Sequence, residues 1–128
     1  MTIVGTISRY LLGLAFIVFG LNGFLQFLPA PPIGGSTGEF FAVILTTHFA
    51  YFIFGVQLLC GLLLLLNRFM LLALMTLAAV LANILTFHIT MQPAGLPMAL
   101  IATLLWFFTA WPLRDRFAPL FLAKIERN

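Results

Sequence analysis

One charged residue interrupts the long apolar centre of this chain. Between Glu39 and Arg114 the only charged side chain is that of Arg68, which follows Asn67. The apolar run on each side of this pair is long enough for a helix that crosses the ~30 Å hydrocarbon core of a bilayer, for which about 20 residues are needed. The chain is therefore predicted to contain an apolar helical hairpin that turns at Asn67 and Arg68.

The composition is typical of integral membrane proteins. Hydrophobic residues make up 63% and charged residues 7% of the sequence, and the mean hydropathy is +1.19. Soluble domains average about 25% charged residues, so a soluble fold is excluded. The length of 128 residues leaves room for about four spans and for no second domain. We expect one all-α integral membrane domain over residues 1–128, a bundle of four transmembrane helices in contact with the lipid bilayer.

Four apolar segments are expected to be the spans. They are residues 10–28, about 49–66, 69–91 and about 96–113. The Pro/Gly-rich segments 29–38 and 92–97 are expected to connect spans outside the hydrocarbon core. A break at residues 46–48 indicates a short surface helix, at about 38–46, before the second span. A single long, tilted helix from residue 40 to residue 66 is the rival interpretation.

The basic residues are predicted to lie on one side of the membrane. They are Arg9, Arg68, Arg114, Arg116, Lys124 and Arg127. Four spans place all of them on the same side, as the positive-inside rule requires. The N and C termini are therefore expected to be cytoplasmic, and the mixed basic and apolar tail after Leu113 suits a short helix on that membrane face. Since the cations form no patch or stripe, no nucleic-acid partner is expected.

Uncharged polar side chains concentrate in the half of the bundle that faces away from these cations. The candidate cofactor-binding residues are Asn22, Gln57, Asn83, His88 and His48. Their amide and imidazole groups donate and accept hydrogen bonds, as the carbonyl groups of a quinone headgroup in the membrane would require. The rival interpretation is that they only join helices, each hydrogen bond contributing about 1 kcal/mol or less. The interhelical role is favoured for Asn22 and Gln57, whereas the ligand role and the interhelical role have equal weight for Asn83.

Helix geometry limits how these residues can share a pocket. At about 100° per residue, Asn83 and His88 point roughly 140° apart, whereas Thr86 and Thr90 share the face of Asn83. His48 and His88 are equally far from Arg68 along the chain, which places them at one depth near the outer surface. Two such histidines can ligate haem or a metal, but contacts with headgroups or helix ends are the favoured roles.

No catalytic residue and no metal ligand is assigned from the sequence. Cys60 is the single cysteine, and Glu39 is the only carboxylate expected on the outer side. Neither a Ser-His-Asp nor a Cys-His arrangement can be assembled from the predicted spans. The sequence leaves enzymatic activity undecided and favours a protein that is not catalytic by itself.

Three stretches of the sequence resemble the DoxX family of small four-helix bacterial membrane proteins. They are RYLLGLAFIVFGLNGF in the first span, GVQLLCGLLLLLNRF in the second, and ANILTFHITMQPAGLPMALIATLLWFF toward the end. The resemblance implies a multi-pass protein of the bacterial cytoplasmic (inner) membrane with a link to quinone-dependent redox complexes. Many family members carry a glutamate where this chain has Gln57, so the resemblance implies no proton-handling role at this position.

Together these observations favour an accessory or quinone-proximal subunit of a membrane redox complex, without a catalytic centre of its own. The implied cofactor is a quinone, with haem less favoured, and the implied partners are other membrane subunits or further copies of the chain. The alternative is a structural or assembly protein without a ligand site, whose first span, lined by Gly13, Gly20 and Gly23, docks other membrane helices. A small carrier, formed only as an oligomer, is a third and weaker class.

Overall fold

A computed structural model provides the structure of the chain and describes residues 2–28 and 33–127. The regular elements in these ranges are all helical. They are α1 (Ile3–Leu25), α2 (Gly35–Thr46), α3 (Phe49–Leu66), α4 (Met70–Thr90), η1 (Pro93–Gly95), α5 (Leu96–Ala110), η2 (Trp111–Leu113), α6 (Arg114–Phe117) and η3 (Ala118–Phe121). Helices α1, α3 and α4, together with the segment Pro93–Phe121 around α5, are long and apolar enough to cross a membrane. The chain is thus consistent with a multi-pass membrane protein.

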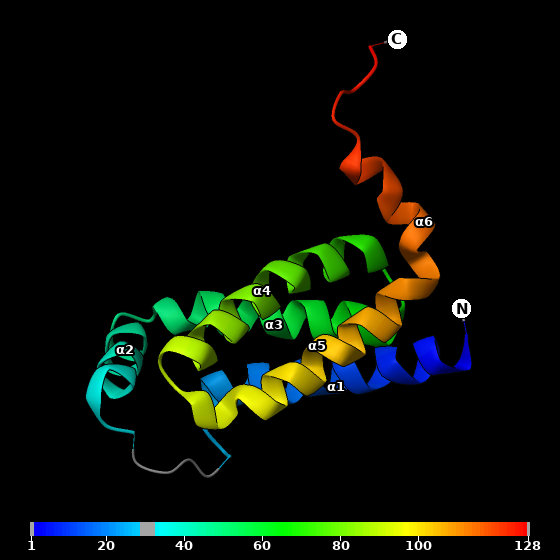
Figure 1. The fold of residues 1–128 in the computed structure, drawn as a ribbon. Coiled ribbons are helices and arrows are strands. Elements are labelled where there is room, and N and C mark those ends of the chain that lie inside the picture. The colour runs from blue at the N-terminus through cyan, green and yellow to red at the C-terminus, as the bar shows by residue number, and fades with distance from the viewer. Residues whose placement is uncertain (1, 29–32, 128) are drawn as a thin grey trace.

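The four long helices lie alongside one another and form the bundle (Figure 1). Helix α1 packs most extensively against α3 and next against α5, while α4 packs against both α3 and α5. The two ends of the chain lie at the same end of the bundle as the turn between α3 and α4. Helix α2 crosses the opposite end, and the segment after α5 bends away from the bundle axis. We call the end with the two chain termini and the α3–α4 turn the basic end, and the opposite end the α2 end.

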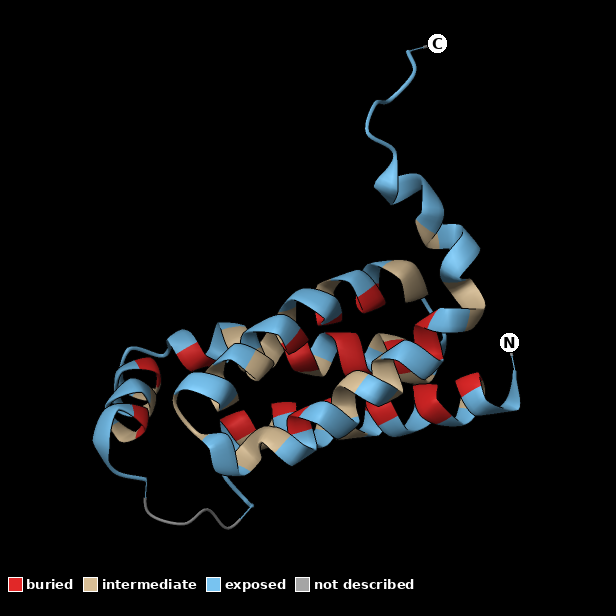
Figure 2. Ribbon diagram, in the orientation of Figure 1, coloured by how far each residue is buried: buried red, intermediate tan, exposed pale blue. Residues whose placement is uncertain are grey.

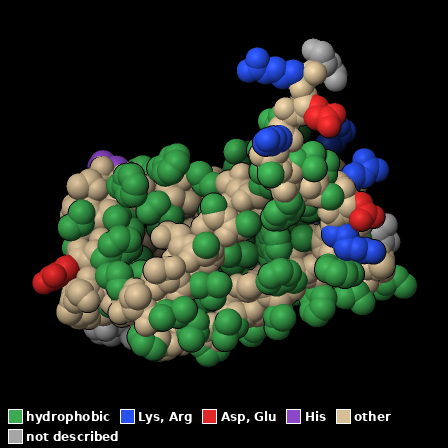
Figure 3. Space-filling model, turned by 45° about the horizontal axis from the view of Figure 1, so that its top comes forward, with side chains coloured by type: hydrophobic (Ala, Val, Ile, Leu, Met, Phe, Trp, Pro, Cys, Tyr) green, Lys and Arg blue, Asp and Glu red, His purple; other side chains and the backbone are tan. Residues whose placement is uncertain are grey.

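The core of the bundle is apolar and runs along the inner faces of the helices (Figure 2). Its buried members are Leu12, Phe16, Cys60, Leu64, Ala73, Leu74, Leu77, Leu81 and Ala110. Hydrophobic side chains also cover much of the outer surface, whereas Lys and Arg side chains gather near α6 and the N-terminus (Figure 3). Such a continuous apolar exterior is expected where lipid, and not water, surrounds a protein.

Glycines bring α1 and α3 into backbone contact. A Cβ atom built on Gly61 would lie 2.8 Å from the carbonyl oxygen of Gly13, and one built on Gly20 would lie 2.9 Å from the backbone nitrogen of Leu58. Small residues thus let the backbones of these two helices approach closely. Because α3 covers this face, a surface that docks another membrane helix has to lie elsewhere on the bundle.

Helices α2 and α3 are separate, so the rival single long helix is wrong. The backbone turns at His48, which adopts a left-handed conformation with φ of 61°, and the Thr47 hydroxyl donates to the Val43 carbonyl at 2.6 Å. Helix α3 has the predicted bounds. Helix α2 begins at Gly35, earlier than expected, so residues 35–38 are helical and not loop. Residues 29–32 of the predicted loop lie outside the described residues.

Helix α1 begins well before the predicted start at Tyr10. The Thr2 side chain caps it by accepting a hydrogen bond from the Gly5 N–H at 3.0 Å, a typical N-cap contact. Arg9 therefore lies inside the helix and not at its start, and it is only 6% exposed. Its Nη1 donates to the carbonyl groups of Leu64 and Leu65 in the last turn of α3. A side chain expected at the membrane boundary instead joins two helices.

Trp106 joins α5 to α4, and its replacement by phenylalanine is expected to destabilise the bundle by about 1 kcal/mol. The indole Nε1 donates to the Leu74 carbonyl at 2.9 Å, a bond that phenylalanine cannot make. Trp111→Phe is the matched control, because Trp111 is 65% exposed. Unfolding in mixed detergent micelles, followed by circular dichroism, measures both variants. If both replacements lower the free energy of unfolding equally, the Trp106 hydrogen bond has no special role in stability.

Candidate functional site

Asn22 is engaged locally, at the end of α1. Its Oδ1 accepts a hydrogen bond from the backbone N–H of Leu28 at 2.8 Å, and its carbonyl accepts one from the N–H of Gln26 at the same distance. Gln26 adopts a left-handed conformation with φ of 49°, which ends the helix and folds the chain back over Asn22. These contacts favour the structural role of Asn22 over a ligand contact.

Gln57 points into the bundle. It shares one face of α3 with Cys60, Gly61 and Leu64, at the helical spacing of three and four residues, and all four are buried. Its side chain is 6% exposed, and no hydrogen bond joins its carboxamide to another of the described residues. A buried amide in a membrane helix contributes to packing specificity or contacts a ligand, and its place beside the tight α1–α3 contact suits the first role.

Asn83 points away from the bundle. The buried face of α4 consists of Ala73, Leu74, Leu77 and Leu81, whereas Asn83 is exposed. It lies about 20 Å along the helix from Met70, well inside the length of a span. No hydrogen bond joins its carboxamide to any described residue. The structure thus separates Asn83 from Gln57 and places it on the outer surface of the bundle.

The neighbours of Asn83 on this outer surface are small or carry hydroxyl groups. They are Ala78, Ala79, Ala82, Thr86 and Thr90, all exposed. The hydroxyl groups of the two threonines donate to the carbonyls of Ala82 and Thr86, at 2.8 and 2.7 Å, so their polar atoms are satisfied within the helix. The predicted shared face of Asn83, Thr86 and Thr90 is confirmed. We call these six residues the α4 outer face.

The two histidines lie near the α2 end, but each is held by its own surroundings. His88 Nδ1 lies 3.0 Å from the Gln92 carbonyl oxygen, and its ring packs on Gly95, where an added Cβ would come within 2.2 Å of the imidazole. His48 is exposed and stacks on Tyr51, with 5.3 Å between ring centroids. Within residues 2–28 and 33–127 no three His, Cys, Asp or Glu side chains group closely enough to hold a metal ion. The contact of His88 with the Gln92 carbonyl is a helix-end contact, whereas the His48 ring contacts only Tyr51 among the interactions described above.

Sequence reasoning missed the contacts that fix α2 to the end of α4. The Thr37 hydroxyl donates to the Met91 carbonyl at 2.6 Å. Phe40 and Phe41 pack on Phe87, with ring centroids 5.7 and 5.6 Å apart. We call these contacts the α2 latch. The phenylalanine-rich sequence of α2 was a signal for such a cluster, but composition alone could not distinguish it from lipid contact.

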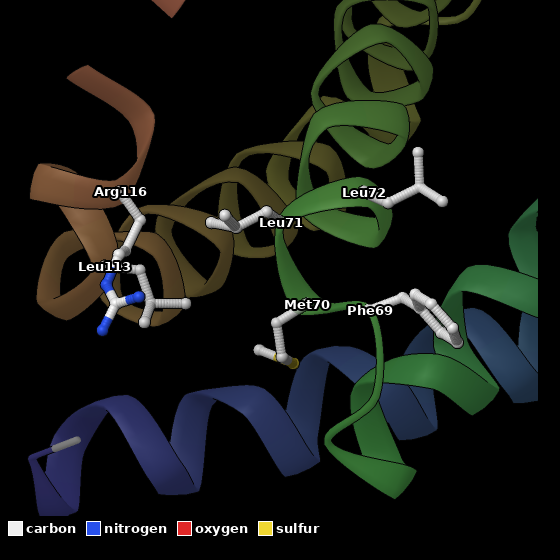
Figure 4. Close-up of a pocket in the computed structure, with 6 residues that line it drawn as sticks. All are labelled: Phe69, Met70, Leu71, Leu72, Leu113 and Arg116. Atoms are coloured by element: carbon white, nitrogen blue, oxygen red, sulfur yellow. The ribbon is translucent and has the colours of Figure 1, made fainter. Parts of the chain in front are cut away.

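A hollow lies far from these polar residues, at the basic end. It has a volume of about 460 Å³ and is bounded by the first turn of α4 and by the segment that follows α5 (Figure 4). Its lining residues are Phe69, Met70, Leu71, Leu72, Leu113 and Arg116. Five of the six are apolar and the sixth is a cation. Sequence reasoning did not place Arg116 beside the start of α4, because their proximity depends on how the chain bends after α5.

The structure therefore distributes the five predicted site residues over four environments. Asn22 accepts a hydrogen bond from the Leu28 N–H just beyond the end of α1, Gln57 is buried in the core, and Asn83 faces outward, while His48 and His88 lie at the α2 end. Their part in binding a cofactor stays a prediction. Comparisons with family models, with curated proteins and with solved structures found no match to this chain.

Proposed function

We propose that the chain is an accessory subunit of a membrane redox complex and that it meets its partner, and the quinone that the complex uses, at the α4 outer face. The redox part of this proposal rests on the resemblance to DoxX proteins, which also implies the bacterial cytoplasmic membrane. The docking part rests on one structural observation, the outward-facing amide of Asn83.

An amide that faces hydrocarbon is unfavourable unless it is hydrogen-bonded. Transfer of an unpaired amide into an apolar medium costs roughly 2–7 kcal/mol. Asn83 lies well inside a span and has no partner among the described residues, whereas Thr86 and Thr90 beside it are satisfied by their own helix. A helix from another protein that packs on this face would supply the missing hydrogen bond and exclude lipid from it.

The small neighbours of Asn83 suit such a contact. Alanine and threonine let two membrane helices approach closely, and they are typical of interfaces between spans. The carboxamide is also the group that a quinone headgroup needs, since its NH₂ donates to a carbonyl oxygen. A quinone held at the boundary between this chain and a partner would explain why the polar group is on the outside of the bundle.

Asn83→Leu is expected to reduce the amount of partner protein and of quinone that co-purifies with the chain by about 3- to 30-fold. This range corresponds to the loss of one hydrogen bond between membrane helices, roughly 0.6–2 kcal/mol. The measurement is purification of the tagged chain from its native membrane in a mild detergent. Mass spectrometry then identifies the proteins, and organic extraction quantifies the quinone.

Thr86→Val is the matched control for this experiment. It removes a polar atom from the same face, but an atom that the helix already satisfies, so co-purification should not change. If neither a partner nor a quinone accompanies the unmodified chain, the proposal is wrong. Equal losses in both variants would mean that the shape of the face, and not the Asn83 amide, determines binding.

The same observation favours a second function, that of an assembly protein without a ligand site. A helix that pairs with Asn83 satisfies the amide whether or not a quinone is present. The two functions differ in one result of the purification. A partner that accompanies the chain in an Asn83-dependent way, with no quinone above the level of an unrelated membrane protein, would establish the assembly role.

A further inference from the structure

The hollow at the basic end combines apolar walls with one cation, and neither proposed function uses it. Met70 and Leu71 approach from the first turn of α4, while Leu113 and Arg116 approach from the segment after α5 (Figure 4). Leu71 points across the gap toward Leu113 and Arg116. The hollow is therefore a cleft between two segments that are far apart in the sequence.

The position of this cleft is where lipid headgroups would meet a spanning bundle. It adjoins the turn at Asn67 and Arg68, which joins two helices long enough to cross a membrane. The Lys and Arg side chains gather at this end of the molecule (Figure 3). Apolar walls one helical turn deep, with cations at the rim, match the boundary between acyl chains and phosphates.

Arg116 lines the cleft and, like Arg68 in the adjoining turn, has no hydrogen-bond or ion-pair partner within the described residues. Arg114 donates to the Trp111 carbonyl at 3.0 Å and lies 4.8 Å from the centre of its ring. Arg9 is buried and donates to α3. Neither Asp115 nor any other described residue forms an ion pair or a hydrogen bond with Arg116. Its guanidinium is available to an anion at the cleft.

We propose that this cleft binds an anionic phospholipid. The upper part of an acyl chain lies against Met70, Leu71 and Leu113, and Arg116 donates to the phosphate, which a guanidinium can contact through two N–H groups. An anionic headgroup is preferred over a zwitterionic one because cations outnumber carboxylates at this end: Arg68, Arg114, Arg116, Lys124 and Arg127 stand against Asp115 and Glu126. Basic pockets between spans on the cytoplasmic side are a known mode of binding such lipids.

The test uses the full chain in detergent, incubated with equal amounts of phosphatidylglycerol and phosphatidylcholine, with retained lipid measured by native mass spectrometry. The unmodified chain should retain the anionic lipid preferentially. Arg116→Gln should lower retention of phosphatidylglycerol about fivefold, the effect expected for one basic residue near an anionic surface. Arg116→Lys keeps the charge and should preserve the preference over phosphatidylcholine.

Arg127→Gln is the matched control, because it removes the same charge from the same end without touching the cleft. Salt screens an exposed charge that does not contact the bound lipid, so retention should stay within about twofold of the unmodified chain. Leu71→Ala tests the apolar wall and should lower retention of both lipids together. If Arg116→Gln and Arg127→Gln lower the retention of phosphatidylglycerol equally, the proposal is wrong, because the overall positive charge and not the cleft then attracts the lipid. Equal retention of the two lipids, or displacement of bound lipid by inorganic phosphate, would also overturn it.

Discussion

Gly61→Ala is expected to destabilise the bundle by about 1–3 kcal/mol, the usual effect of forcing an extra carbon into a tightly packed contact. The added methyl group would lie 2.8 Å from the carbonyl oxygen of Gly13 and 3.0 Å from the backbone nitrogen of Ile17. Both are backbone atoms, so no side-chain rotation can relieve the clash and α1 has to move away from α3. Reversible unfolding in mixed micelles, followed by circular dichroism, measures the free energy of unfolding.

Gly55→Ala is the control on the same helix. An added Cβ there meets only the tip of the Phe24 ring, at 3.9 Å, which is an ordinary contact. Both variants gain the same helix propensity, up to about 1 kcal/mol in an exposed helix, so their difference isolates the backbone contact. If Gly61→Ala proves as stable as Gly55→Ala, the close approach of α1 and α3 is not what holds these helices together.

Arg9→Met is expected to destabilise the bundle by about 1.5–3 kcal/mol, the range for a hydrogen bond to a charged group. The last carbonyl groups of any helix lack donors within the helix. Arg9 supplies donors to two of them, on Leu64 and, at 3.2 Å, on Leu65. Methionine fills most of the volume but donates nothing, so both carbonyls lose a charged partner.

Two further variants separate this contact from the effect of the charge itself. Arg9→Lys keeps the charge but presents a single nitrogen to the two carbonyls, so its stability should lie between those of the methionine variant and the unmodified chain. Arg114→Met deletes an exposed arginine at the same end and should change stability by no more than about 0.5 kcal/mol. Full stability of Arg9→Met in the same unfolding experiment would show that the buried guanidinium does not hold α1 to α3.

The bounds of α3 were predictable from the sequence because local chemistry sets them. Helix α3 has the predicted bounds since His48 and Asn67, at its two ends, adopt left-handed backbone conformations with φ of 61° and 53°. Asparagine and histidine tolerate this conformation better than most residues. The break before α3 and the turn after it are therefore visible in the order of residues alone.

The role of Arg9 was not predictable in the same way. A charged residue beside an apolar run is usually the flank of a span, and the sequence placed it there. Its actual position follows from the Thr2 cap, which starts α1 early, and from the carbonyls of α3, more than fifty residues away in the chain. Only the packing of the two helices shows that donor and acceptors meet.

The sequence predicted which face of a helix a candidate residue occupies, but not which groups its side chain contacts. The angle between Asn83 and His88 follows from helix geometry, and the structure places them on different sides of α4, one exposed and one against Gly95. The engagement of Asn22 depends on the left-handed turn at Gln26, which returns the Leu28 N–H to its side chain. The sequence does not show such a turn in advance.

The α2 latch has a consequence for the order in which the chain is assembled during synthesis. Thr37 and Met91 are 54 positions apart, so α2 leaves the ribosome well before the end of α4 that holds it. Until then α2 has its phenylalanines without the ring of Phe87 to pack on. The contacts that complete the α2 end of the bundle can therefore form only after the end of α4 has been synthesised.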